Sequence, residues 1–334
     1  MKKLAIILLL TLGFGMESFG AKNATVNKPI LKVKLLNSYP GSGIISPIYD
    51  ILNEKYEVIV VNAEKSSEKY DLIIDGVYGN APMKPNEKAI KMYYTAEAIL
   101  PDLKDYDLTL GFDYIDDPRY FRLPYYYLSG LWADKLVANS NMRLTNGTCN
   151  PNKKNFACFL VSNGYTNDTR TNNPLDGVKA RDHLFHKLSS SYNKKVLSGG
   201  RHLNNIGRNL EISETMEWLS NCKFVIAYEN QTHNGYMTEK LFQAYFAGAI
   251  PIYYGDKTAV LQDINKDAII YAGDFNTEDD LVDYIKKVDN DDALYCDIWN
   301  KNLLIDPSKD WSVVQDKLRT KILQLLDKKL KKNV

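Results

Sequence analysis

Short apolar segments with the two-residue period of β-strands alternate with longer segments of helical period, beginning near residue 30. In the first part of the chain this pattern predicts a helix at 44–53 and strands at 31–35, 56–61, 71–74, 90–94 and 108–112. The segment 56–61, Tyr-Glu-Val-Ile-Val-Val, is nearly all apolar, which favours a strand covered on both faces. Alternating strands and helices are typical of a parallel α/β sheet, so residues 28–138 are expected to form a Rossmann-like domain.

A polar stretch at residues 139–155, rich in Asn, is interpreted as a linker. The alternation then resumes, with strands predicted at 156–161, 195–197, 223–228, 250–254 and 268–271 and helices at 177–190, 213–219, 238–247 and 278–288. Residues 156–304 are therefore expected to form a second Rossmann-like domain. Two such domains usually bind a ligand in the cleft between them, at the carboxyl ends of their strands.

The two ends of the chain depart from this pattern. Residues 1–21 place two lysines before an uncharged run at 4–16 and small residues after it, as in a signal segment or membrane anchor. The run is shorter than the roughly 20 residues of a membrane span, and a buried strand remains an alternative. Residues 305–334 have the pattern of a basic amphipathic helix, predicted either to dock on a domain or to contact an anionic membrane surface.

The composition is that of a soluble globular protein: 334 residues, 45% hydrophobic and 25% charged. A net charge of +1 gives no strong attraction to nucleic acid, and no such partner is expected. The four cysteines, at 149, 158, 222 and 296, contain no C-x-x-C pair, which argues against zinc or a redox motif. Cys158 and Cys222 lie in or beside apolar runs and are expected to be inert buried thiols rather than a disulfide framework.

The most informative stretch is residues 223–256, KFVIAYENQTHNGYMTEKLFQAYFAGAIPIYYGD, which has the pattern strand, polar loop, helix, strand. Thr238 suits a helix N-cap, and Glu239 and Lys240 fall in the first turn. The start of a helix attracts phosphate, and a lysine there adds a positive charge. The pattern is that of a nucleotide-sugar site, with an ordinary capped surface helix as the alternative.

The order of motifs in this stretch closely resembles the signature of the α-1,3/4-fucosyltransferase family, most of all its bacterial, Helicobacter-like members. The matching positions are Glu229-Asn230, Tyr236-x-Thr238-Glu239-Lys240 and Pro251-x-x-x-Gly255. Five further segments are similar to the family: Ser162-Asn163 and Lys179–Asp182 in the second half, and residues 93–97, 107–111 and 117–124 in the first. The resemblance covers about residues 30–300.

The resemblance implies a GT-B fold, with two facing Rossmann-like domains, the first for the acceptor and the second for GDP-fucose. It implies transfer of L-fucose from GDP-β-L-fucose, with inversion, to O3 of N-acetylglucosamine in N-acetyllactosamine-type glycans. No cofactor is required, and a divalent metal is at most stimulatory. The implied general base is Glu97, and the implied donor contacts are Arg181 and Lys240 on the pyrophosphate, Tyr236 and Glu239, with Asn230, Ser162 and Asn163 lining the donor cleft.

These roles agree with the chemistry. A sugar hydroxyl needs a carboxylate to take its proton, and the departing GDP needs positive charge beside it. The family often has Gly-Glu-Asn at the base, where this chain has Ala96-Glu97-Ala98. Two rival functions stay open: a GT-B glycosyltransferase with another acceptor or nucleotide sugar, and a secreted sugar-binding protein.

Two weaker signals have simpler explanations. Asp289-Asn290-Asp291 matches a D-x-D metal motif but follows a predicted helix, which favours a solvated turn, and His183 and His186 alone are a weak metal pair. Of the four N-x-S/T sequons, the one at Asn230 lies in the predicted donor site and is attributed to chance.

GDP-fucose is made in the bacterial cytosol or delivered to the Golgi lumen. The enzyme is therefore expected to be membrane-associated, with residues 4–16 as an uncleaved anchor. The expected location is the cytoplasmic face of the inner membrane in a bacterium or the Golgi membrane in a eukaryote, in preference to secretion.

Overall fold

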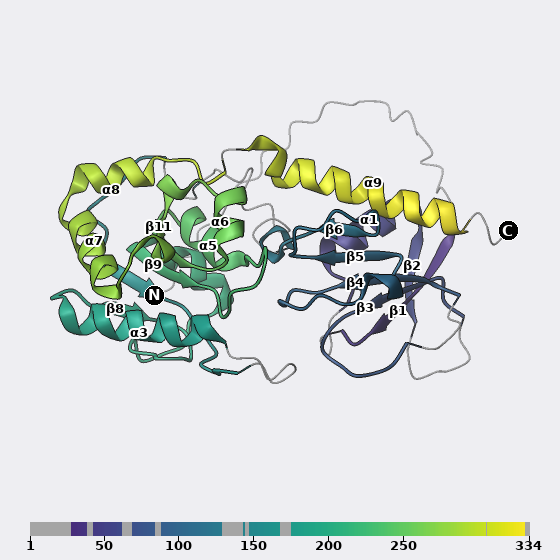
Figure 1. Ribbon diagram of the computed structural model, residues 1–334, viewed down its shortest axis with the longest axis horizontal. Helices are drawn as coiled ribbons and strands as arrows, with labels where there is room; N and C mark the ends of the chain where they lie inside the picture. Colours follow the sequence, from purple (N-terminus) through teal and green to yellow (C-terminus); the bar gives the residue numbers. More distant parts are fainter. Residues whose placement is uncertain are drawn as a thin grey trace, which may run out of the picture.

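The computed structural model describes residues 28–38, 43–61, 69–83, 88–128, 143, 147–167, 175–304 and 306–330. Two α/β lobes lie side by side, and a long helix leaves the second lobe and lies along the first (Figure 1). The predicted signal or anchor at 1–21 lies outside the described residues and stays a prediction. Within the described ranges, no helix is both long and apolar enough to cross a membrane.

The first lobe is a six-stranded parallel sheet in the order β2-β1-β3-β4-β5-β6. The chain passes from β1 through α1 to β2 at the edge and then crosses back to β3, so its direction across the sheet changes between β1 and β3. Ligands bind at such switch points in open α/β sheets. The elements are β1 (Ile30–Leu36), α1 (Ser46–Lys55), β2 (Glu57–Val61), β3 (Leu72–Asp75), β4 (Ile90–Tyr94), β5 (Leu108–Gly111), β6 (Tyr120–Arg122) and the 3-10 turns η1 (Leu103–Asp105) and η2 (Tyr125–Leu128).

Strand β2 was expected to be covered on both faces, and this is wrong. It is the edge strand of its sheet, and the side chains of Ile59 and Val60 are 37% and 48% exposed. An apolar run is typical of a central strand, but the position of a strand in its sheet depends on the connections made by the whole chain.

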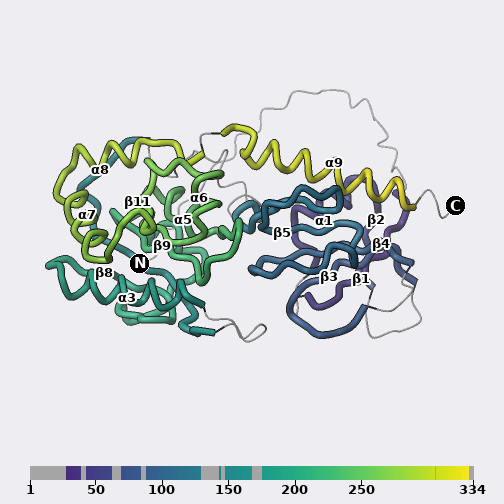
Figure 2. Tube along the Cα trace, in the orientation of Figure 1, coloured from purple at the N-terminus to yellow at the C-terminus, as the bar shows by residue number. Residues whose placement is uncertain are grey.

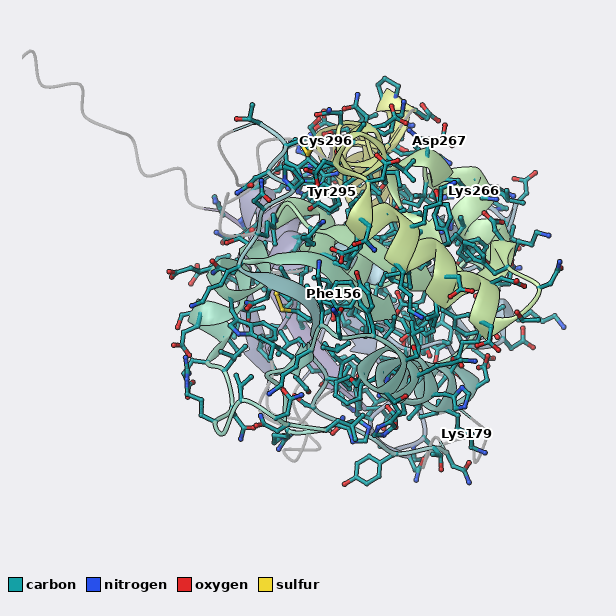
Figure 3. The ribbon with its side chains drawn as sticks, turned by 90° about the vertical axis from the view of Figure 1, so that its left-hand side faces the viewer. Phe156, Lys179, Lys266, Asp267, Tyr295 and Cys296 are labelled. Carbon is teal, nitrogen blue, oxygen red and sulfur yellow. A yellow bond between two sulfur atoms is a disulfide. The ribbon has the colours of Figure 1, made fainter. Side chains whose placement is uncertain are left out.

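The second lobe has a five-stranded parallel sheet in the order β11-β10-β9-β7-β8. Its central strand β9 is buried along its whole length, and the ring of Phe224 makes edge contacts with Phe156 and Tyr295, which Figure 3 labels. The strands are β7 (Asn155–Phe159), β8 (Val196–Ser198), β9 (Cys222–Tyr228), β10 (Ile250–Tyr254) and β11 (Ile270–Tyr271), and the helices are α3 (Asp176–Ser191), α4 (Thr215–Ser220), α5 (Glu239–Phe246), α6 (Lys257–Asp263), α7 (Glu278–Asn290) and α8 (Asp292–Trp299). Short 3-10 turns join them at η3 (Ile212–Glu214), η4 (Lys266–Ala268), η5 (Ala272–Asp274) and η6 (Pro307–Lys309).

The predicted C-terminal helix is α9 (Trp311–Leu330), which extends over the first lobe (Figure 2). Its apolar stripe is buried against that lobe, where α9 packs on α1, and consists of Val314, Leu318, Ile322 and Leu326. Arg319 pairs with Glu54, and Lys329 lies 2.8 Å from Asp107. Because the apolar stripe is occupied within the chain, only the polar face of α9 is left to meet another surface.

The two lobes contact each other along a seam formed by η2, β6 and the loop before α5. The ring of Tyr126 stacks on Phe242 of α5 with centroids 4.1 Å apart, and the guanidinium of Arg122 lies 2.7 Å from the carboxylate of Asp263. Gly235 has φ +74°, and a Cβ there would lie 2.2 Å from the carbonyl oxygen of Phe112. Glycine is therefore required for the lobes to approach this closely.

The aspartates of the D-x-D sequence do not form a solvated turn. Asp289 is buried, with its carboxylate 2.9 Å from Nζ of Lys223 and 2.5 Å from Nζ of Lys194. Asp291 caps α8 by accepting a hydrogen bond from the amide of Leu294. The expectation of a solvated turn is wrong because Lys194 and Lys223, which are remote in sequence, form ion pairs with the buried carboxylate of Asp289.

All four cysteines are paired, so the expectation of free thiols is wrong. Cys149 bonds to Cys296 across 147 residues, and Cys158 of β7 bonds to Cys222 of β9 across 64 residues. Cys158 and Cys222 are buried as predicted, but the parallel sheet places their strands side by side. Cys149 ties the end of the predicted linker to α8.

We expect the Cys149→Ser/Cys296→Ser double variant to lose about 2–4 kcal/mol of unfolding free energy, because the disulfide closes a long loop in the unfolded chain. Denaturant unfolding of wild type and variant under non-reducing conditions measures the loss. Equal midpoints and slopes for the two proteins would contradict the expectation.

His233 and Asp113 form an ion pair across the seam, with nitrogen and oxygen 3.0 Å apart. The hydrogen bond to Asp113 raises the pKa of His233 above 6.5, against a smaller lowering by burial. The pair therefore stabilises the fold fully below about pH 6.5, and its contribution is lost as pH rises through the raised pKa.

We accordingly expect the stability difference between wild type and His233→Asn to shrink as the pH rises above about 6.5, through the raised pKa of His233. Denaturant unfolding at several pH values tests this, with His186→Asn on the exposed face of α3 as the control. A difference independent of pH would show that the imidazolium has no part in joining the lobes.

Candidate active site

A cleft of about 1560 Å³ lies between the lobes, at the carboxyl ends of both sheets. The first lobe contributes the loops after β3 and β4 and the start of η2, through residues such as Tyr78, Glu97 and Tyr125. The second lobe contributes the loops after β7, β8 and β9 and the starts of α3 and α5. Among the cleft residues are seven of the predicted site residues: Glu97, Ser162, Asn163, Arg181, Asn230, Glu239 and Lys240.

Glu229 organises the floor of this cleft and was not among the predicted site residues. It follows the buried strand β9, is fully buried, and accepts hydrogen bonds from the amide and the hydroxyl of Thr238, both at 2.7 Å. Lys240 Nζ donates to the same carboxylate at 3.1 Å, and the Tyr253 hydroxyl donates at 3.3 Å. The available sequence signal was an acidic residue directly after the apolar run Phe224–Tyr228, because a carboxylate in such a buried position needs hydrogen-bond partners.

The start of α5 presents charge and backbone donors to the cleft. Lys240 is about one quarter exposed, and although burial lowers its pKa, the charges of Glu229 and Glu239 raise it above the ordinary value. The predicted N-cap Thr238 precedes α5, but its hydroxyl binds Glu229 and does not cap the helix. The first-turn amides of α5 consequently have no side-chain cap, which suits an anionic ligand.

Arg181 comes from the second turn of α3 and is 3% exposed. Its guanidinium donates to the carbonyl of Asn163, while its buried Nε has no hydrogen-bond partner among the described residues. Burial lowers the pKa of Arg181, with the charges of Asp182 and Glu229 opposing that effect. Oδ1 of Asn230 is likewise buried without a partner in the described part of the chain. Buried polar groups are nearly always satisfied, so these atoms fit a polar ligand.

Glu97 follows β4 on the opposite wall of the cleft. A local turn holds its backbone, because the Glu97 amide donates to the hydroxyl of buried Thr95 at 2.9 Å. Its side-chain oxygen Oε1 accepts a hydrogen bond of 2.8 Å from the Tyr78 hydroxyl. Tyr125 also lines the cleft, and its pKa is raised by burial first and then by the charge of Glu239, with Lys240 opposing and Glu97 adding less.

Tyr236 is the predicted site residue that the structure does not bring to the cleft wall. Its side chain is 3% exposed and packs on Phe112 across the seam, with ring centroids 4.7 Å apart. The residue lies beneath the cleft because Gly235 brings this part of the loop against the first lobe. In this structure Tyr236 joins the lobes, whereas a donor contact was expected.

Among the described residues, no group of three or more His, Cys, Asp and Glu side chains is arranged to hold a metal ion. His183 and His186, the weak metal pair of the sequence, have separate partners. His183 pairs with Glu278 at 2.6 Å, and His186 lies edge-on to Phe185.

Two lobes built on parallel sheets, with a cleft between the carboxyl ends of their strands, define the GT-B class of glycosyltransferase fold. The family model described as "Glycosyltransferase family 10 (fucosyltransferase) C-term" matches residues 150–332, and "Alpha-(1,3)-fucosyltransferase FucT N-terminal domain" matches residues 33–129. The chain belongs to glycosyltransferase family 10, the fucosyltransferases, as the sequence motifs predicted.

Individual relatives with similar sequences or structures are also fucosyltransferases. Alpha-(1,3)-fucosyltransferase FucT of Helicobacter pylori is 29% identical over 316 residues, covering 85% of this chain and 62% of that protein. The 4-galactosyl-N-acetylglucosaminide 3-alpha-L-fucosyltransferase 9 of Bos taurus is 29% identical over 164 residues, covering 48% and 41%. The chain thus spans less than two thirds of the length of these relatives. The crystal structure of an α1,3-fucosyltransferase with GDP has 25% identity and a TM-score of 0.70, with 94% of each chain covered.

We expect Glu229→Ala to destabilise the fold by about 3 kcal/mol, because it leaves Lys240 and Thr238 without their buried acceptor. The Glu229→Ala/Lys240→Met double variant should lose less than the sum of the single losses, since no uncompensated charge remains.

Denaturant unfolding of the four proteins completes the cycle. Glu214→Ala, which breaks an exposed ion pair with Arg208, is the control and should cost less than about 1 kcal/mol. Additive losses for Glu229 and Lys240 would contradict their coupling.

Proposed function

We propose that the chain transfers L-fucose from GDP-β-L-fucose to O3 of N-acetylglucosamine in N-acetyllactosamine-type glycans, with inversion at C1. The observation that carries this proposal is the division of the cleft: a carboxylate, Glu97, on one wall, and Arg181, Lys240 and an uncapped helix start on the other. The names of the relatives from H. pylori and Bos taurus support the sugar and the acceptor class.

The donor binds in the second lobe in this proposal. Nε of Arg181, Lys240 Nζ and the first amides of α5 contact the pyrophosphate, and the unpartnered amide oxygen of Asn230 accepts from the donor. Glu239 lies beside Lys240, with 3.9 Å between their charged atoms, and holds sugar hydroxyls. Ser162 and Asn163 complete the wall above β7. The structure of the homologous α1,3-fucosyltransferase with GDP supports this choice of nucleotide.

The reaction is a single displacement. The acceptor O3 forms a bond to C1 of fucose from the face opposite GDP, the bond between C1 and the phosphate oxygen breaks, and Glu97 takes the proton from O3. The electron pair of the broken bond leaves with GDP, whose added negative charge is stabilised by Arg181, Lys240 and the start of α5. No covalent intermediate with the protein is needed for an inverting transfer.

For the location, we propose membrane association through the uncharged segment 4–16, which lies outside the described residues. The exposed basic residues of α9, such as Lys317 and Lys328, support contact with an anionic surface. Disulfides persist in oxidising compartments, so the pairs at Cys149 and Cys158 favour a Golgi-type lumen over the cytoplasmic face.

The test is GDP release by the purified protein from GDP-fucose and N-acetyllactosamine, without added metal. Glu97→Gln should lower kcat by about 10²–10⁴, because it removes the base. Lys240→Ala should lower the rate by about 10²–10³ and weaken GDP binding, because it removes charge from the leaving-group site.

Two controls separate these effects from general damage. The first is Lys179→Ala, because Lys179 is near Arg181 in sequence but lies on α3 at the outer edge of the molecule (Figure 3). The second is Glu57→Gln, because Glu57 is exposed on β2. Both should retain wild-type turnover. GDP binding without turnover would indicate another acceptor or sugar, and absence of both would refute the proposal and leave the sugar-binding alternative.

A further inference from the structure

The loop between β3 and β4 carries Tyr78 to the cleft, and Asn37 fixes the position of that loop. Asn37 follows β1 with φ +48°, in the left-handed region that Asn tolerates better than most residues. Its side-chain amide accepts from the Ala81 amide at 2.8 Å and donates to the Ala81 carbonyl at 3.1 Å. Its backbone carbonyl accepts from the Tyr78 amide at 2.7 Å. The loop is therefore attached to the end of β1 at Tyr78 and again at Ala81.

The contact between Asn37 and the β3–β4 loop requires two glycines in that loop. A Cβ at Gly76 would lie 2.8 Å from the Asn37 carbonyl oxygen, and one at Gly79 would lie 2.6 Å from its side-chain oxygen. The buried carboxylate of Asp75 completes the support, since it accepts from the Asn37 side chain at 2.9 Å and from the Tyr106 hydroxyl at 2.7 Å. The position of Tyr78 is thus determined by packing around the end of β1.

From this loop the Tyr78 hydroxyl donates to Oε1 of Glu97 at 2.8 Å, and both residues line the cleft. A carboxylate that serves as a base needs one oxygen for the incoming proton, and a fixed hydrogen bond to the other oxygen limits rotation of the group. A donor to the carboxylate also stabilises its charged form.

We propose that Tyr78 is a positioning residue for the transfer: its phenol holds Oε1 of Glu97, so that Oε2 receives the proton of the acceptor hydroxyl. This inference rests on the proposed function of Glu97 as the base. It assigns the β3–β4 loop a part in the reaction, which sequence motifs around Glu97 do not indicate.

The test is Tyr78→Phe, which keeps the ring and removes the hydroxyl. We expect kcat to fall about tenfold, as for the loss of one hydrogen bond to a charged group, with GDP affinity unchanged. Tyr49→Phe is the matched control: Tyr49 has the same 38% exposure, but on α1 outside the cleft.

An unchanged kcat in Tyr78→Phe would overturn the proposal, and so would a rise in acceptor KM alone, which would indicate that Tyr78 only contacts the acceptor. If the wild type binds GDP but transfers no fucose, the proposed function itself fails. If the wild type transfers fucose and Tyr78→Phe transfers it at the same rate, the inference about Tyr78 alone fails.

Discussion

The buried carboxylate of Glu229 is the constraint on which the second lobe's part of the site depends. A charge removed from water must be compensated, and Glu229 is compensated by the amide and hydroxyl of Thr238, by Lys240 and by Tyr253. These donors come from α5 and β10, so one carboxylate fixes the start of a helix against two neighbouring strands. Because Lys240 Nζ donates to Glu229, this carboxylate both favours the charged form of Lys240 and orients its side chain.

The second requirement is that the two lobes keep a fixed relation. Tyr126 stacks on Phe242 within α5, and Gly235 lies against Phe112, so the helix that carries Lys240 is also the helix that contacts the first lobe. The hydrophobic core runs through this seam from one lobe to the other. Packing that joins two domains in this way limits their independent motion. The separation of Glu97 on one wall of the cleft from Lys240 on the other is thus determined by the core.

Much of this architecture is local and could be predicted. Strands β4 and β10 have the predicted bounds, and the start of α5 after Thr238 was visible as a cap followed by an acidic and a basic residue. The family motifs placed Glu97, Arg181 and Lys240 in one cleft because motif residues follow strand ends, and parallel strands end at one edge.

The errors concern partners that are distant in sequence. The pairing of Cys149 with Cys296, the lysines around Asp289 and the exposure of β2 all depend on which elements become neighbours, which periodicity does not specify. The packing of Tyr236 has a related cause: Gly235 brings the loop against the first lobe, and the Tyr236 ring packs on Phe112 in the seam, while its predicted contact with the donor stays a prediction. The role of Glu229 could not be predicted from the sequence, because it depends on the burial of the carboxylate in the folded chain.

The separation of the seam from the cleft loops has a consequence for how such an enzyme can diversify. The segments after β3 and β4 that carry Tyr78 and Glu97 contribute none of the seam contacts described here between η2, β6 and α5. Substitutions in these segments can reshape the cleft wall that carries Glu97 while the helix that presents Lys240 keeps its support. Under the proposed function, new acceptor preferences are therefore accessible without reselecting the nucleotide site, whereas a change at Tyr126 or Gly235 would alter both at once.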